Sequence, residues 1–202
     1  MYISLEGIDT SGKSTQINLL KNAYPQAIFT KEPGGSLIGM QIREMILKEN
    51  QKDTNKIPNA MDSKTEFLLF LADRAEHTAK IILPNQDKLI ISDRSLISGI
   101  AYSKGIEIPQ AIELNLFATG GIVPDLVIML EIDTKELQTR LNKKSNDIIE
   151  KRGIAYLLDV QKKIKSMTEK IKSLGCELHF IDASKDKEVI HTQIKQIIDS
   201  KL

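Results

Sequence analysis

A phosphate-binding signature stands near the start of the chain, where GIDTSGKS at residues 7–14 fits the pattern G-x-x-x-x-G-K-[ST]. Gly7 and Gly12 permit backbone conformations in which successive N–H groups converge on an anion. Lys13 adds a mobile positive charge for the β- and γ-phosphates, and Ser14 adds a hydroxyl ligand for Mg²⁺. The pattern predicts a nucleoside triphosphate site at Gly7, Ile8, Asp9, Thr10, Ser11, Gly12, Lys13, Ser14 and Thr15.

A carboxylate suited to a metal, Asp93, ends the apolar segment LIISD. The carboxyl ends of buried parallel strands face the ligand crevice of an open α/β sheet. An aspartate at that point can hold Mg²⁺ directly or through water, although a strand-end aspartate can also belong to an ordinary turn. Because the glycine loop already requires a metal partner, we expect Ser14 and Asp93 to bind Mg²⁺ together.

Three classes of protein use such a nucleotide site: switch GTPases, motor or remodelling ATPases, and kinases that act on a small acceptor. The segments NKIP at 55–58 and NKKS at 142–145 lack the aspartate of the guanine-reading pattern N-K-x-D. A length of 202 residues leaves little room for the further domains of a motor. A kinase needs a second anion site, and arginine suits it because arginine binds phosphate through two parallel hydrogen bonds.

Several arginines could form this second site. Phe70 and Arg74 stand four residues apart in a predicted helix and share one face, which suits a base stacked on the ring. The alternative is a core phenylalanine with an arginine that extends to solvent. Arg94 directly follows Asp93, so we expect it near the transferred phosphoryl group. Arg43 alone would be a solvated charge.

A charged segment at 142–152, NKKSNDIIEKR, has little to bury and is either a plain surface loop or a mobile lid. A basic lid that closed over ATP would stabilise the charge that develops on the γ-phosphoryl group. A run of solvated charges is the alternative interpretation. The basic residues that flank the segment or begin it are Arg140, Lys143 and Lys144.

The elements that position these residues alternate between strand and helix. Strands are predicted at 2–6, 27–32, 88–93, 126–132 and 177–182. Helices are predicted at 13–22, 36–48, 62–83, 95–104, 109–119, 134–141, 157–174 and 185–200, with a loop at 49–60. The alternation predicts an α/β, P-loop NTPase three-layer fold in one domain over 1–202, with a central parallel sheet of about five strands.

Bulk composition narrows the range of partners. A formal net charge of +1 gives no support for broad nucleic-acid or membrane binding. The one cysteine, Cys176, cannot form an internal disulfide, which fits a reducing compartment. The chain opens on a predicted strand instead of a leader, and its longest apolar run is far short of the ~18 residues of a membrane span. We therefore expect a soluble cytoplasmic protein.

Five segments occur in an order that resembles the thymidylate kinase family: EGIDTSGKST, TKEPGG, FLLFLADRAEH, LIISDRSLISGIAYSKG and PDLVIMLEID. The likeness extends from Tyr2 to the last predicted strand. It implies ATP-dependent, Mg²⁺-assisted phosphorylation of dTMP to dTDP in dTTP synthesis, and a homodimer. Another P-loop nucleoside monophosphate kinase remains an alternative, as does a non-catalytic nucleotide-binding module.

The resemblance also implies roles for single residues. Asp9 would face the acceptor nucleotide, Phe70 would stack on thymine, and Arg74 would hydrogen-bond it. Arg94 would bridge the donor and acceptor phosphates. The further acceptor-site residues implied are Pro33, Arg43, Ser98 and Tyr102. Ala183 would lie on the adenine side of the ATP site. Arg140 is predicted to bind ATP as part of the lid, and the residues assigned to catalysis are Lys13, Arg94 and Arg140.

Four positions depart from the family's pattern. Gly99 stands where Asn, Thr or Ser often bonds the base, and Ser95 stands where an aromatic residue is usual. Thr10 replaces an arginine of the glycine loop, and Ile148 replaces an arginine of the lid. Because two arginines are missing, we expect the positive charge of catalysis to come from Arg140, Lys143 and Lys144.

Overall fold

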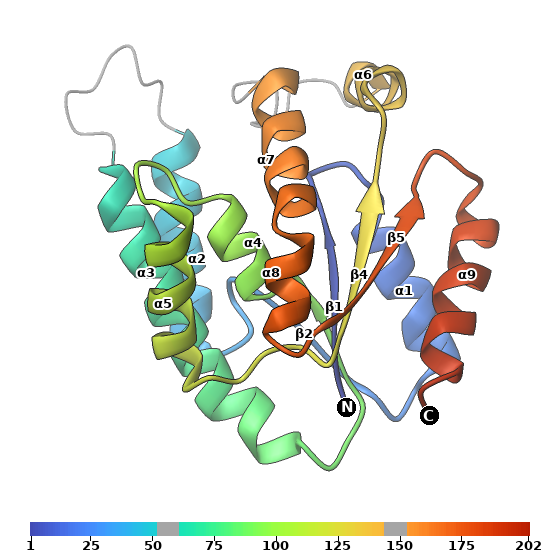
Figure 1. Ribbon diagram of the computed structural model, residues 1–202, viewed down its shortest axis with the longest axis horizontal. Coiled ribbons are helices and arrows are strands. Elements are labelled where there is room, and N and C mark those ends of the chain that lie inside the picture. Colours follow the sequence, from blue (N-terminus) through green and yellow to red (C-terminus); the bar gives the residue numbers. More distant parts are fainter. Residues whose placement is uncertain (52–60, 144–152) are drawn as a thin grey trace.

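A parallel sheet forms the centre of the protein (Figure 1). The computed structural model describes residues 1–51, 61–143 and 153–202. The strands are β1 Tyr2–Gly7, β2 Ile28–Lys31, β3 Ile90–Asp93, β4 Leu126–Glu131 and β5 Glu177–Asp182. They follow the order β2-β3-β1-β4-β5, and each neighbouring pair is parallel. The predicted fold class and the five predicted strands are confirmed.

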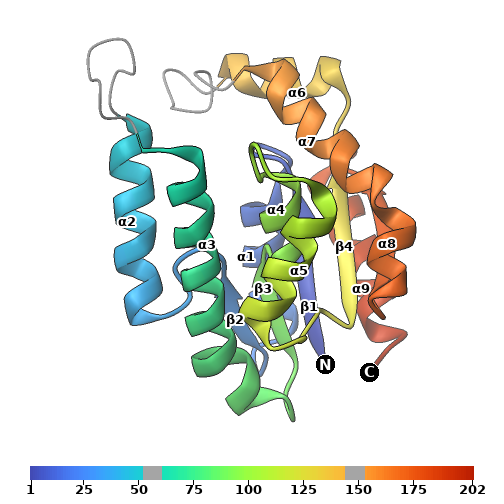
Figure 2. The same cartoon turned by 60° about the vertical axis from the view of Figure 1, so that its left-hand side comes forward.

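Helices cover both faces of the sheet. They are α1 Lys13–Ala23, α2 Leu37–Gln51, α3 Ser63–His77, α4 Leu96–Ala101, α5 Ile108–Thr119, α6 Thr134–Lys143, α7 Ile154–Ser166, α8 Thr168–Ser173 and α9 Lys187–Asp199. Helices α1 and α9 pack together on one face, and α4, α7 and α8 lie on the other (Figure 1). Helix α2 pairs with α3, which packs against α5, on the side away from α1 and α9 (Figure 2).

Local chemistry explains where α3 begins. Asp62 caps the helix, since its carboxylate accepts hydrogen bonds from the backbone N–H groups of Lys64 at 2.9 Å and Thr65 at 3.3 Å. The predicted helix 62–83 does not stay α-helical throughout. It passes into a π-helix at Thr78–Ile82 and then a 3₁₀ turn at Leu83–Asn85, which contains Pro84. Proline cannot donate a backbone hydrogen bond, so the regular α ladder cannot continue through it.

Two further predictions need correction. The apolar spacing over 157–174 predicted one helix, but α7 and α8 are separate and meet at Met167, whose φ of −90° and ψ of 5° leave the α region. Both helices keep the same spacing of buried residues, so periodicity alone does not mark the break. The loop predicted at 49–60 is wrong at its start, because α2 continues to Gln51. The rest of that loop, 52–60, lies outside the described residues.

The sheet brings the ends of its buried strands to one edge. Every residue of β1 is buried, and in the register of β1 with β3 Leu5 lies opposite Asp93. Gly7 lies opposite Leu130 on the other neighbour, β4. The glycine loop and Asp93 therefore emerge side by side at the carboxyl edge, where open α/β sheets bind ligands. Within the three described stretches, no helix has the length and apolar character needed to cross a membrane.

Candidate active site

The glycine loop between β1 and α1 has a backbone that only glycine can supply at its first position. Gly7 has a φ of +149°, and a Cβ there would lie 2.6 Å from the Ser11 hydroxyl and 2.9 Å from the Leu130 carbonyl. Gly12 caps α1 in a left-handed conformation with a φ of +100°. The first N–H groups of a helix lack intrahelical acceptors and attract anions. The predicted phosphate loop thus has the geometry of an anion site.

Lys13 is folded back onto this loop. Its Nζ donates hydrogen bonds to the carbonyls of Gly7 at 2.8 Å and Ile8 at 3.1 Å. Burial, reinforced by the nearby Arg94 charge, lowers the pKa of Lys13 to about 8. A partly desolvated ammonium gains more from an incoming anion than a solvated one does, so the position of Lys13 is compatible with the predicted phosphate site.

The predicted metal ligands have a donor set that fits Mg²⁺. Ser14 is exposed at the start of α1, and Asp93 ends β3 at the same edge of the sheet. One carboxylate oxygen of Asp93, Oδ1, is buried without a hydrogen-bond partner among the described residues. Mg²⁺ usually keeps several waters and uses one or two protein oxygens together with the substrate's phosphates. A hydroxyl and an unpaired carboxylate oxygen meet that requirement.

Arg94 joins the glycine loop to helix α4. Its guanidinium donates to Asp9 Oδ1 at 2.6 Å, to the Gly7 carbonyl at 3.0 Å and to the Ser98 hydroxyl at 3.0 Å. It also lies over the ring of Tyr102, 5.1 Å from the ring centre. The backbone of Arg94 is left-handed, with a φ of +75°, a strained conformation that is concentrated at functional sites.

Beneath Arg94 lies a buried carboxylate that the sequence reasoning missed. Glu6 is fully buried in β1 and accepts hydrogen bonds from the hydroxyls of Ser95 at 2.7 Å and Ser98 at 2.5 Å. Burial raises the pKa of Glu6. Ser95 also caps α4 by accepting from the N–H of Ile97, so its small hydroxyl serves two purposes that an aromatic ring cannot. A carboxylate inside the apolar run YISLEG is the signal that could have identified Glu6.

A pocket of about 430 Å³ opens beside this arginine. Its walls come from the glycine loop, the turn after β2 and helices α2, α3, α4 and α7. The structure brings together in this one pocket all the residues predicted for the acceptor: Asp9, Pro33, Arg43, Phe70, Arg74, Arg94, Ser98 and Tyr102. Lining residues that the sequence reasoning did not assign include Glu32, Glu66, Phe67, Lys104 and Tyr156.

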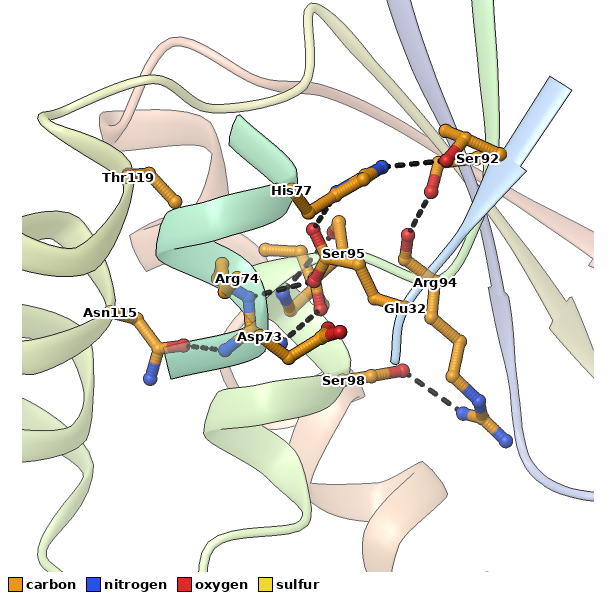
Figure 3. Close-up of polar contacts among 12 residues, drawn as sticks. Glu32, Asp73, Arg74, His77, Ser92, Arg94, Ser95, Ser98, Asn115 and Thr119 are labelled. Atoms are coloured by element: carbon orange, nitrogen blue, oxygen red, sulfur yellow. Dashed lines mark hydrogen bonds and ion pairs between the residues drawn. The ribbon is translucent and has the colours of Figure 1, made fainter. Parts of the chain in front are cut away.

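Arg74 is fixed in the wall of the pocket by a buried network (Figure 3). It is 2% exposed, and its Nε donates to Glu32 Oε2 at 2.8 Å. The other Glu32 oxygen pairs with His77 Nδ1 at 2.8 Å, and His77 Nε2 lies 2.7 Å from the Thr30 hydroxyl. Burial alone would raise the pKa of Glu32, but Arg74 and His77 outweigh it and hold that pKa below its usual range. The arginine is therefore held and does not extend to solvent.

The turn that carries Pro33 is anchored from two helices. Asp73 of α3 accepts a hydrogen bond from the Gly34 N–H at 2.8 Å, and Arg43 of α2 donates to the Pro33 carbonyl at 3.1 Å. Helix α2 can approach only because Gly39 has no side chain, since a Cβ there would overlap Asp73. Arg43 is thus part of the pocket wall, and the EPGG motif is a rigid rim.

Arg140 lies on the opposite side of the glycine loop. It emerges from α6, pairs with Glu136 at 2.7 Å, and donates to the carbonyls of Thr10 at 3.1 Å and Ala183 at 2.5 Å. It therefore ties the phosphate loop to the turn after β5, the two segments predicted to contact ATP. The side chains of Lys143 and Lys144 lie outside the described residues, as do 144–152 of the predicted lid.

Comparison with known proteins agrees with this geometry. Residues 5–194 match the family model described as thymidylate kinase. The chain is 51% identical over 199 residues to a thymidylate kinase of Helicobacter hepaticus, covering 98% of each, and 53% identical over 194 residues to one of Wolinella succinogenes, covering 96% of each. It is similar to the crystal structure of thymidylate kinase from Ehrlichia chaffeensis, with a TM-score of 0.71, 27% identity and coverage of 98% of both chains. The chain belongs to the thymidylate kinase family.

Proposed function

We propose that this chain, as one catalytic domain over residues 1–202, transfers the γ-phosphoryl group of ATP to the 5′-phosphate of dTMP. The products are dTDP and ADP. The observation that carries the proposal is the position of Arg94, which bonds the glycine loop through Gly7 and Asp9 and also lines the acceptor pocket. One guanidinium thereby lies between the two places where phosphates would sit.

On the donor side, the loop amides and Lys13 hold the β- and γ-phosphates. Mg²⁺, when bound, would be held by Ser14 and Asp93 and would neutralise charge on the β- and γ-oxygens. Arg140, with Ala183 and Thr10, would close the ATP site on the adenine side. Lys143 and Lys144 follow Arg140 in sequence, and we propose that they add positive charge near the triphosphate. Phosphoryl transfer depends mainly on such positioning and charge neutralisation.

On the acceptor side, an oxygen of the dTMP phosphate attacks the γ-phosphorus while the bond to the β-phosphate oxygen breaks. The attacking oxygen of the dTMP phosphate is already ionised, so no general base is required. Phe70 supplies a flat surface for the base, and Arg74 supplies N–H donors without any acceptor. A donor-only group suits the carbonyl oxygens of thymine or uracil and disfavours the exocyclic amine of cytosine.

The sugar would lie beside Ser98 and Tyr102. The hydroxyl of Tyr102 is buried and has no hydrogen-bond partner within the described stretches. Burial raises the pKa of Tyr102 to about 12, so this hydroxyl is neutral at neutral pH and can both donate and accept. A hydroxyl at this depth suits contact with the deoxyribose, and Asp9 lies nearby through its bond to Arg94.

We further propose a homodimer in the cytoplasm, the cellular compartment in which its nucleotide substrates occur. Large apolar side chains are exposed on three helices that lie side by side, α2, α3 and α5 (Figures 1 and 2). Leu37 is 79% exposed and Phe117 is 85% exposed, with Ile38 and Leu68 above half. Such exposed apolar surface is typical of an interface. Phe117→Glu should halve the mass measured by light scattering, and an unchanged mass would contradict this interface.

The reaction is tested by coupled detection of ADP release with five acceptors: dTMP, dUMP, UMP, CMP and GMP. We expect the highest kcat/KM with dTMP. A preference for a ribonucleotide would place the activity with another class of nucleoside monophosphate kinase. ADP release with none of the five would indicate a nucleotide-binding module instead of a kinase.

A further inference from the structure

Gly99 and Arg74 occupy neighbouring space on two helices. A Cβ at Gly99 would lie 2.5 Å from Nη1, 2.7 Å from Nη2 and 2.8 Å from Cζ of Arg74. These separations are well below van der Waals contact, so the guanidinium fills the volume that any side chain at position 99 would need. A flexible arginine could move aside at little cost, and whether this one can move depends on what holds it.

Three protein acceptors hold the Arg74 guanidinium. Nε donates to Glu32, Nη1 donates to the side-chain oxygen of Asn115 on α5, and Nη2 donates to the Ser95 carbonyl at 3.4 Å (Figure 3). A guanidinium has five N–H groups, so these bonds leave two for a ligand in the pocket. The charge of Glu32 neutralises Arg74, but only Asn115 holds it from the side of α5.

Asn115 has the properties of a dedicated support. It is fully buried, and its Nδ2 donates to the carbonyl of Ala111 at 2.6 Å, one turn earlier in the same helix. That bond fixes the orientation of the amide and turns its oxygen toward Arg74. The side chain therefore makes one local bond and one bond across to α3, and the second is the one that reaches the pocket wall.

We propose that Asn115 is a positioning residue that holds the Arg74 guanidinium against Gly99, so that at this wall of the pocket the base is hydrogen-bonded by Arg74 and not by a side chain at position 99. The inference rests on the proposed function, since it assigns the acceptor pocket to the base of a nucleotide. Glycine at position 99 and asparagine at position 115 then act together to fix the position of the Arg74 guanidinium. Gly99 leaves the space, and Asn115 keeps the guanidinium in it.

Three variants at the α5 positions separate this role from ordinary packing. Asn115→Leu keeps the volume but removes the acceptor, and we expect the KM for dTMP to rise about tenfold, with the KM for ATP and the kcat within about twofold of wild type. Asn115→Asp retains an oxygen acceptor for Arg74 but loses the Nδ2 donor to the Ala111 carbonyl, so it should restore part of the lost affinity. Thr119→Val is the matched control, because the hydroxyl of Thr119 donates to the Leu116 carbonyl of its own helix and, within the described residues, to no group of the pocket. Equal KM values for dTMP in Asn115→Leu and Thr119→Val would overturn the proposal.

A double-mutant cycle tests Gly99 independently. Gly99 lies within α4, where helix propensity favours alanine over glycine, so without a clash Gly99→Ala should do no harm. We expect Gly99→Ala to raise the KM for dTMP about tenfold in the wild-type background. In an Arg74→Lys background, which lacks the guanidinium, the same change should have no further effect. Additive effects in the cycle would show that the two residues are not coupled and would overturn the proposal.

The cycle also distinguishes this proposal from the proposed reaction. The wild-type enzyme is assayed first, and absence of turnover with dTMP would contradict the reaction. The free energies of unfolding of the same four proteins, measured in urea without nucleotide, report the packing of Gly99 against Arg74 regardless of substrate. Turnover of dTMP with additive unfolding free energies would contradict the packing while leaving the reaction standing.

Discussion

The glycine loop and the proposed acceptor pocket are built in different ways. The loop is one continuous segment that uses backbone N–H groups and a single lysine, and its shape depends on the left-handed Gly12 and the crowded Gly7. The pocket is assembled from separate helices, and its central arginine depends on Glu32, 42 residues away in sequence, and on Asn115, 41 residues away. A binding site formed by one continuous segment can be predicted from a sequence motif, whereas a site formed by side chains distant in sequence depends on tertiary packing.

The two regions also treat charge differently. Lys13 is desolvated, and among the described residues its hydrogen-bond acceptors are carbonyl oxygens, so no carboxylate there pairs with its charge through a hydrogen bond. Arg74 is paired with the Glu32 carboxylate before any ligand arrives, so it offers a ligand oriented hydrogen-bond donors more than net positive charge. This contrast suits a reaction in which one nucleotide carries the phosphates to be activated and the other must be selected by its base.

Removal of the loop lysine should have the largest effect. Lys13→Ala should lower kcat by about a thousandfold or more, because the transferred phosphoryl group loses its cation. The unfolding temperature should change little, since a buried lysine with a lowered pKa contributes no net electrostatic stability. Steady-state kinetics and thermal unfolding measure the two quantities. Near-normal turnover would show that the glycine loop is not the site that binds the transferred phosphate.

Substitution of Arg74 should impair binding in the proposed acceptor pocket. Arg74→Lys keeps a positive charge beside Glu32 but loses the fork of donors, and we expect the KM for dTMP to rise roughly 10- to 100-fold. The KM for ATP serves as the internal control and should stay within about twofold. A larger change for ATP than for dTMP would mean that the acceptor site is misplaced.

Substitution of Asp9 should also impair the use of dTMP, but less than substitution of Arg74 does. Asp9 belongs to the loop in sequence but pairs with Arg94, so Asp9→Asn should lower kcat/KM for dTMP by about tenfold and leave ADP affinity unchanged. Titration calorimetry with ADP and initial rates with dTMP measure both. If the response to dTMP were also unchanged, Asp9 would have only a structural role in the turn.

The smallest effect is a dependence of ADP binding on pH. Free Lys13 has a pKa of about 8, and bound phosphates favour its charged form and raise that pKa. Binding therefore takes up a proton above pH 8, and affinity must fall as the pH rises. We expect about a fourfold weaker Kd at pH 8.5 than at pH 7 if only the charged form binds. The same slope in Lys13→Ala would assign the titration to another group.

Much of the fold follows from the sequence because its signals are local. Strand and helix alternate visibly, and the glycine loop lies between the first of each. The π-helix after His77 and the break at Met167 were missed because apolar spacing continues through both. Within the site, the acceptor residues could be placed by resemblance. The carboxylate inside the apolar run YISLEG could have drawn attention to Glu6, but the contacts that make Glu6 and Asn115 supports could not be predicted. Their importance arises from what they contact across the fold, and no spacing along the chain records that.

The central claim is that the two nucleotides are held by separate groups, and crossed titration calorimetry tests it most directly. ADP and dTMP are each titrated into Lys13→Ala and Arg74→Lys. We predict that Lys13→Ala loses ADP affinity and keeps that for dTMP, whereas Arg74→Lys loses dTMP affinity and keeps that for ADP. An equal loss of affinity for ADP and for dTMP in either variant, at an unchanged unfolding temperature, would contradict the claim that separate groups hold the two nucleotides.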